Sequence, residues 1–279
     1  MIAVLGCGRG GPQEGNPQTL IQQGWDEFRL NETIRAEEFF KKAAALAEKG
    51  SPSHLMALYG WGASLSYRTP DPLEEEGAKK YEEVISLAPQ SDMAAWCLLG
   101  LARSIHAVPV GRDPDFDKVR AAYDRLTASF PDHVASEEAF LYKQSTYVSP
   151  LKEEGAKSAL AAVLDFLERK PDSKWQSAGW GLAAECYAIL DNPEKRLDAE
   201  IKALDKAELD PNNPRSDFSG AYWKIASLAE FRAGDFSVAR KFYKKLMDEY
   251  PTDQKRFASE KALERMDATE AALKLGKKP

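Results

Sequence analysis

A chain of 279 residues is long enough to bury a sizeable core, and 43% hydrophobic with 29% charged residues is typical of a folded protein rather than a disordered one. The formal net charge of −6, from 38 basic and 44 acidic side chains, argues against nucleic acid as a partner, because nucleic-acid binding calls for a basic face. No stretch reaches the roughly 18 apolar residues of a membrane-spanning helix, and three cysteines are too few for a disulfide framework.

Residues 1–16 carry two short motifs ahead of the first expected helix. Gly6, Gly8 and Gly11 have the glycine spacing of a dinucleotide-binding loop, but the βαβ unit that this loop requires does not follow. Residues 4–7 (Val-Leu-Gly-Cys) resemble the lipobox of bacterial lipoproteins, in which the cysteine thiol carries the lipid. The resemblance implies lipidation at Cys7, with residues 1–16 as the remnant of a signal peptide and a flexible tether. A disordered cytoplasmic N-terminus is the alternative.

Prolines divide the rest of the chain at regular intervals. Six of them lie 37, 42, 40, 40 and 40 residues apart and are expected to end helices: Pro52, Pro89, Pro131, Pro171, Pro211 and Pro251. A second set follows Asn, Asp or Ser and is expected to begin helices: Pro17, Pro72, Pro114, Pro150 and Pro193. This alternation predicts two helices per period of about 40 residues. It gives six helical hairpins over residues 17–251 and a final capping helix at about 252–275.

The clearest hairpin is predicted at residues 223–251. Its first helix carries Trp223 and Ala226 on one face, a turn follows at Gly234, and its second helix carries Ala239 and Tyr243. This pattern resembles the tetratricopeptide repeat, W-x2-L-G-x2-Y followed by A-x3-F and a closing proline, although this period exceeds the 34 residues of that family. The resemblance implies an all-α fold, an α-solenoid of about six hairpins over residues 17–275.

Internal duplication supports the same architecture. The segment PLEEEGAK at residues 72–79 recurs as PLKEEGAK at residues 150–157, which is two periods later. HEAT and armadillo repeats also have periods near 40, but they lack the tryptophan, glycine and alanine pattern seen here.

No catalytic or metal-binding motif accompanies the repeats. His54 and His133 fall at equivalent positions of different repeats, and neither belongs to a metal-ligand pattern. Cys97 and Cys186 fall on apolar helix faces, where a free cysteine behaves as a small hydrophobic residue. We therefore expect no enzymatic activity, no metal and no cofactor.

A stacked array of hairpins has a concave face that the first helix of each pair lines. By resemblance to the family, this groove binds a segment of a protein or peptide partner. The positions expected to face it are Lys224, Leu228, Phe231 and Arg232 in the last hairpin, and Cys97, Leu101 and Ser104 in the third. Their mixture of basic and apolar side chains suits a peptide that carries an acidic group.

The junctions at residues 130–140 and 250–263 resemble those of bacterial envelope repeat proteins, namely outer-membrane assembly lipoproteins and proteins associated with the Tol-Pal system. This resemblance favours a periplasmic protein in the cell envelope that contacts the membrane only through a lipid at Cys7. A cytoplasmic repeat adaptor or regulatory module is the second hypothesis.

Overall fold

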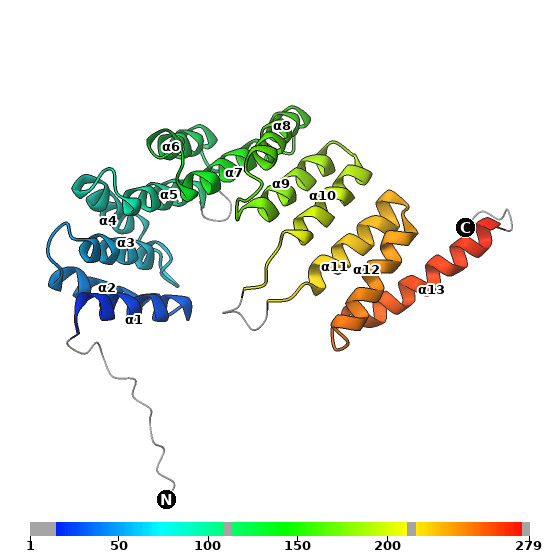
Figure 1. Cartoon of the computed structure of the whole chain (residues 1–279), viewed down its shortest axis with the longest axis horizontal. Helices are drawn as coiled ribbons and strands as arrows, with labels where there is room; N and C mark the ends of the chain where they lie inside the picture. The colour runs from blue at the N-terminus through cyan, green and yellow to red at the C-terminus, as the bar shows by residue number, and fades with distance from the viewer. Residues whose placement is uncertain (1–14, 109–112, 211–215, 275–279) are drawn as a thin grey trace, which may run out of the picture. The chain divides into compact units, whose positions relative to one another are not determined.

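A computed structural model describes residues 15–108, 113–210 and 216–274, and every regular element in these ranges is helical (Figure 1). The helices form six consecutive hairpins and one further helix, so the predicted all-α repeat fold is confirmed. Their bounds are α1 Pro17–Arg29, α2 Thr33–Leu46, α3 Pro52–Ser66, α4 Glu74–Leu87, α5 Asp92–His106, α6 Phe116–Ser129, α7 Val134–Val148, α8 Glu153–Arg169, α9 Gln176–Ile189, α10 Pro193–Asp205, α11 Ser219–Leu228, the π-helical turn η1 Ala229–Ala233, α12 Phe236–Glu249 and α13 Lys255–Lys274.

The predicted helix starts are only partly correct. Pro17 and Pro193 do begin α1 and α10, and the side chains of Asn16 and Asn192 accept hydrogen bonds from the backbone N–H groups of the first turn. The predicted starts at the other three prolines of this set are wrong, because α4, α6 and α8 begin two or three residues later.

The proline predicted to end the first hairpin instead begins a helix. Pro52 is the first residue of α3, and the Ser51 side chain caps that helix. Pro89, Pro131, Pro171 and Pro251 each follow a helix end, as predicted. Pro211 lies outside the described residues.

The chain divides into two compact units, Met1–Lys143 and Gln144–Pro279, and the boundary in the sequence falls within α7. In unit 1, each helix from α1 to α6 packs against the next, and the first helices of neighbouring hairpins also touch, α1 against α3 and α3 against α5. In unit 2, consecutive helices from α8 to α13 pack in the same way.

Glycines allow the first helices of unit 1 to approach one another. The Phe40 ring lies between α1 and α3, where a Cβ added at Gly24 or Gly60 would come within 2.8 or 2.3 Å of ring carbons. One hairpin later, the Tyr81 ring occupies the equivalent place, and a Cβ at Gly62 or Gly100 would lie 2.8 Å from it. In α2 and α4, one aromatic ring of the second helix thus fills a slot that only glycine leaves open.

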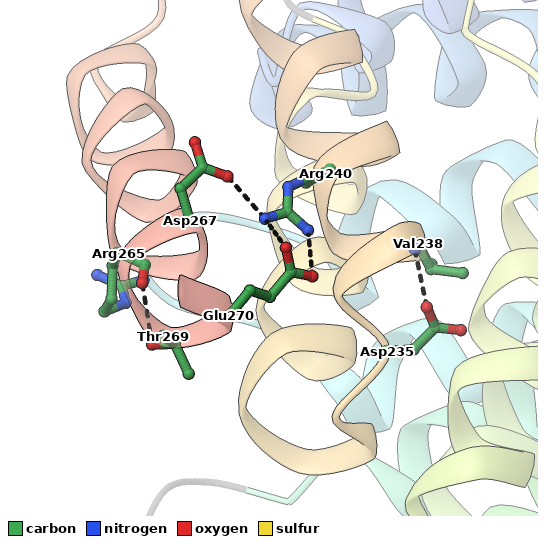
Figure 2. A network of polar contacts seen from close by, with 7 residues as sticks. All are labelled: Asp235, Val238, Arg240, Arg265, Asp267, Thr269 and Glu270. Carbon is green, nitrogen blue, oxygen red and sulfur yellow. Dashed lines mark hydrogen bonds and ion pairs between the residues drawn. The ribbon is translucent and has the colours of Figure 1, made fainter. Parts of the chain in front are cut away.

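The hairpin at residues 223–251 forms as predicted, with one difference. The Trp223 and Tyr243 rings meet edge to face at 5.4 Å, and Gly234 takes the left-handed conformation at φ 70°. Asp235 accepts a hydrogen bond from the Val238 N–H and so caps α12 (Figure 2). The end of the first helix, however, is the π-helical turn η1 rather than a continuation of α11.

Helix α13 covers the end of unit 2 through apolar and ionic contacts. Ala262 and Met266 are fully buried against the core of the last hairpin. Figure 2 shows the guanidinium of Arg240, in α12, donating to the carboxylates of Asp267 and Glu270. The predicted capping helix is therefore present, and Phe257 near its start is exposed.

Candidate functional site

Aromatic side chains from several repeats line a continuous surface in unit 1. Two cavities, of about 330 and 490 Å³, share Tyr67 and Arg103 in their walls. We call this surface the aromatic groove and define it by Trp25, Phe28, Tyr59, Tyr67, Tyr123 and Tyr142, together with Arg103 and His106. Most of these residues belong to α1, α3, α5 and α7, the first helices of four successive hairpins.

The rings of the aromatic groove are held by one another. Trp25 meets Phe28 edge to face at 5.6 Å and lies 5.8 Å from Tyr59, while Phe28 meets Tyr67 at 6.1 Å. Such edge-on pairs contribute to stability beyond the area that they bury. Tyr67 and Tyr142 nevertheless remain 52% and 38% exposed, so part of this aromatic surface is accessible to a partner.

Arg103 supplies the positive charge of the aromatic groove. It forms an ion pair with Glu138, whose side chain is only 5% exposed, and its guanidinium lies 5.3 Å from the centre of the Tyr142 ring. No acidic side chain of the described residues lines either cavity. The groove therefore combines apolar ring faces with one cation, the Arg103 guanidinium, which is fixed by its ion pair with the buried Glu138.

Burial also shifts the pKa values of three other groups in the groove. Burial lowers the pKa of His106, whose Nδ1 lies 3.1 Å from the Tyr123 hydroxyl. Burial raises the pKa of Tyr59 to about 12 and that of Tyr123 further still. These hydroxyls remain protonated and can donate or accept hydrogen bonds.

In unit 2, three of the predicted groove residues reach the surface but are engaged in ion pairs or ring contacts. The Lys224 ammonium lies 2.6 Å from the buried carboxylate of Glu200, and Arg232 donates to Asp191 at 2.7 Å. Phe231 is 63% exposed, with the Arg265 guanidinium 5.0 Å from its ring centre. Lys224 also lines a cavity between α7, α9, α10 and α11.

The remaining predicted groove residues are less accessible to a binding partner than expected. Leu228 is buried in the core of unit 2, and Cys97 is fully buried in unit 1, where burial raises the pKa of its thiol. Leu101 packs against the same core as Cys97, and the Ser104 hydroxyl donates to the Leu101 carbonyl at 2.9 Å. Leu228 and Cys97 are corrections: the periodicity placed them on the correct helices, but these side chains face inward. Cys7 lies outside the described residues.

The histidines and cysteines of the described chain have local roles. His54 is buried and accepts a hydrogen bond from the Gly50 N–H, while the His133 ring pairs with Asp92 at 2.7 Å. Burial raises the pKa of the Cys186 thiol to about 11. Among residues 15–108, 113–210 and 216–274, no group of three or more side chains could hold a metal ion, and no helix is long and apolar enough to cross a membrane.

Comparisons with known proteins locate the fold among tetratricopeptide repeat structures. No protein-family model and no curated protein matches the chain. The solved structure of PilW, a type IV pilus biogenesis factor, is 15% identical with a TM-score of 0.56, covering 85% of this chain and 95% of that one. PilF from Pseudomonas aeruginosa is 13% identical with a TM-score of 0.54, covering 88% and 97%. A putative kinesin light chain with TPR-like repeats from Podosopora anserina is 11% identical with a TM-score of 0.51, covering 70% and 97%.

These likenesses establish the class of fold, a helical solenoid of the tetratricopeptide type. At such low identity they establish no more than the fold.

Sequence reasoning missed the aromatic groove. Tyr81 is buried in the core of unit 1, whereas Tyr67 is 52% exposed, and the two residues have the same type. The available signal was the recurrence of aromatic residues on successive first helices, Trp25 and Tyr59 being 34 residues apart. Which of these rings stay accessible depends on how closely the helices approach, and this distance is set by the glycine slots.

Proposed function

We propose that the protein is a non-catalytic scaffold that binds a segment of another protein in the aromatic groove of unit 1. The observation that carries the proposal is the accessible aromatic surface around Tyr67 and Tyr142, with Arg103 between the two cavities. Tyrosine, tryptophan and arginine are the residue types that dominate binding energy at protein interfaces. Rings already fixed by edge-to-face packing lose little conformational entropy when a partner binds.

The experiment compares the partners retained by the full chain and by a Tyr67→Ala/Tyr142→Ala double variant. Identification by mass spectrometry is followed by affinity measurement with the purified partner. We expect the double variant to bind at least tenfold more weakly while keeping the circular dichroism spectrum of the parent. Phe257→Ala is the matched control, because it removes an exposed aromatic ring from α13 in unit 2. Equal affinity of the double variant and the parent for every partner would refute the proposal.

We further propose that the scaffold works in the bacterial cell envelope, on the periplasmic side, with a lipid at Cys7. The lipobox-like residues 4–7 and the junctions at residues 130–140 and 250–263 support this setting. The fold likeness to PilW, which is described as a pilus biogenesis factor, is compatible with it. The alternative is a cytoplasmic adaptor, and the fold likeness to a kinesin light chain is equally compatible with that role.

The setting is tested by the DNA upstream of Met1 and by lipid labelling. An in-frame apolar segment with Lys or Arg at its start supports the envelope, and incorporation of labelled palmitate that a Cys7→Ala change abolishes supports the anchor. An in-frame stop codon close to Met1, with no lipid incorporated, favours the cytoplasmic adaptor.

A further inference from the structure

Unit 2 contains a cavity of about 360 Å³ that the proposed function does not use. Its walls come from α7, the turn after α7, α9, α10 and α11. We propose that this cavity binds a carboxylate side chain of a protein partner together with the aliphatic side chain next to it, an Asp or Glu beside Leu, Ile or Val. Two independent features, the state of Arg196 and the conformation of Leu151, support this inference.

Arg196 is a partly buried cation without an anion in the described chain. Its Nε atom is buried and has no acceptor, and no described carboxylate lies within 4.0 Å of its guanidinium. A partly desolvated guanidinium is unfavourable unless an acceptor compensates it.

The acidic residues of the cavity do not meet this need. The Glu200 carboxylate is held by Lys224 at 2.6 Å, and Glu185 is exposed and forms no ion pair with Arg196. A carboxylate from outside would pair with the planar guanidinium through two parallel hydrogen bonds. The cavity is thus complementary to an anion that this chain does not supply.

Leu151 presents an aliphatic side chain at the same cavity in an unfavourable backbone conformation. Its φ is 55°, in the left-handed region, and it is 73% exposed. The equivalent turns of three other hairpins place Asn31, Asp191 and Gly234 in this conformation, which are residue types that tolerate it. Strained residues are found where the surrounding structure or a ligand requires them.

The apolar part of the cavity is completed by two further side chains. Val148, at the end of α7, and Ile189, at the end of α9, line it beside Leu151. An aliphatic side chain of the ligand can therefore lie against Leu151 while its neighbouring carboxylate pairs with Arg196.

The test is a selection of phage-displayed random twelve-residue peptides on the immobilised full chain. Peptides that also bind an Arg196→Gln variant are removed. We expect the remaining peptides to carry Asp or Glu beside an aliphatic residue, and synthetic copies to bind Arg196→Gln at least tenfold more weakly than the parent. If no peptide survives the subtraction, or if the survivors lack an acidic residue, the inference is wrong.

Two further variants separate binding from folding. Leu151→Asn relieves the backbone strain while removing the aliphatic wall, so it should weaken binding of the selected peptides at least threefold without lowering the thermal midpoint. Arg169→Gln is the matched control, because Arg169 is exposed on α8 and pairs only with Asp165 among the described residues; binding should not change. Unchanged binding by Leu151→Asn would overturn the aliphatic part of the proposal.

The proposal does not depend on the aromatic groove. The Tyr67→Ala/Tyr142→Ala variant should bind the selected peptides as the parent does. Loss of binding in that variant, with none in Arg196→Gln, would assign the peptides to unit 1 and refute the second site while supporting the proposed function.

Discussion

Single residues in the turns determine how much backbone strain each hairpin carries. Between the two helices of a hairpin, Asn31, Leu151, Asp191 and Gly234 all adopt positive φ. Glycine has no Cβ to clash, and Asn and Asp can hydrogen-bond locally, but leucine has neither advantage. The turn at Leu151 is therefore the least favourable of these four.

Replacing Leu151 with Asn should raise the free energy of unfolding by about 1 kcal/mol, since the left-handed conformation costs an ordinary residue roughly 1–2 kcal/mol. Little burial is lost, because the leucine side chain is largely exposed. Urea unfolding followed by circular dichroism measures the change. Leu30→Asn is the control: Leu30 is similarly exposed but has an ordinary φ of −82°, so no gain is expected. Equal effects of the two substitutions would contradict the explanation.

We expect His106 to make the stability of unit 1 dependent on pH. Burial lowers the pKa of His106 in the folded protein below its unfolded value near 6.5. The unfolded state thus binds more protons as the pH falls through 6.5, so stability decreases from about pH 7 downward until the folded pKa is reached. The groups around the ring, Tyr123, Tyr142 and Arg103, provide no carboxylate to favour the charged form.

We expect His106→Gln to reduce the loss of thermal midpoint between pH 7.5 and pH 5.5 relative to the parent. His133→Gln is a useful comparison, since that ring, unlike His106, pairs with a carboxylate, that of Asp92. If the parent and His106→Gln lose equal stability over this range, the partly buried His106 is not the cause.

At the scale of helices, the glycine slots determine how closely neighbouring hairpins stack. A Cβ at Gly60 would lie 2.3 Å from Cε1 of Phe40, a ring that is itself fully buried. Overpacking of this kind typically destabilises by 1–3 kcal/mol. We therefore expect Gly60→Ala to lower the free energy of unfolding by about 2 kcal/mol, as measured by urea titration.

Gly181→Ala, in α9, should instead increase stability. Nothing lies within 4 Å of a Cβ at this position, so the helix propensity of alanine should raise stability by about 0.5–1 kcal/mol. A destabilising Gly181→Ala, or a harmless Gly60→Ala, would show that close approach is not what glycine provides in these helices.

The helices were predictable because proline spacing and residue types are local features of the chain. Several helices begin later than predicted because the loops before them form their own hydrogen bonds. The Leu73 N–H donates to the Leu65 carbonyl at 2.9 Å, so the chain after Pro72 belongs to the loop rather than to α4. At α6, Asp115 rather than Asp113 caps the helix. The accessible surfaces were not predictable, because the burial of Leu228 and the exposure of Tyr67 depend on contacts between repeats.

In the molecule as a whole, a buried carboxylate, that of Glu230, links the last hairpin to the capping helix α13. Glu230 lies in η1, where the tetratricopeptide pattern prefers tyrosine, and its side chain is 4% exposed. Its carboxylate accepts hydrogen bonds from the Tyr243 hydroxyl at 2.9 Å and from Arg265 of α13 at 2.7 and 2.9 Å. One residue thus connects the last hairpin to the capping helix.

Removal of Arg265 should loosen this end of the array without disturbing the other unit. Arg265→Ala leaves the Glu230 charge buried with only a neutral donor, the Tyr243 hydroxyl. We expect this to lower the free energy of unfolding by about 2–3 kcal/mol. The loss is smaller than for a fully buried ion pair because Arg265 is half exposed. In a repeat array, such a loss acts mainly on neighbouring elements. Hydrogen exchange measured by mass spectrometry should therefore accelerate in α11, α12 and α13 and remain unchanged in α1–α4.

The control is Arg256→Ala, which removes an exposed i,i+4 ion pair with Glu260 from the same helix and should change hydrogen exchange in neither region. Acceleration throughout the chain would mean that the two units unfold as one, and that the cap stabilises the whole array rather than its last repeat.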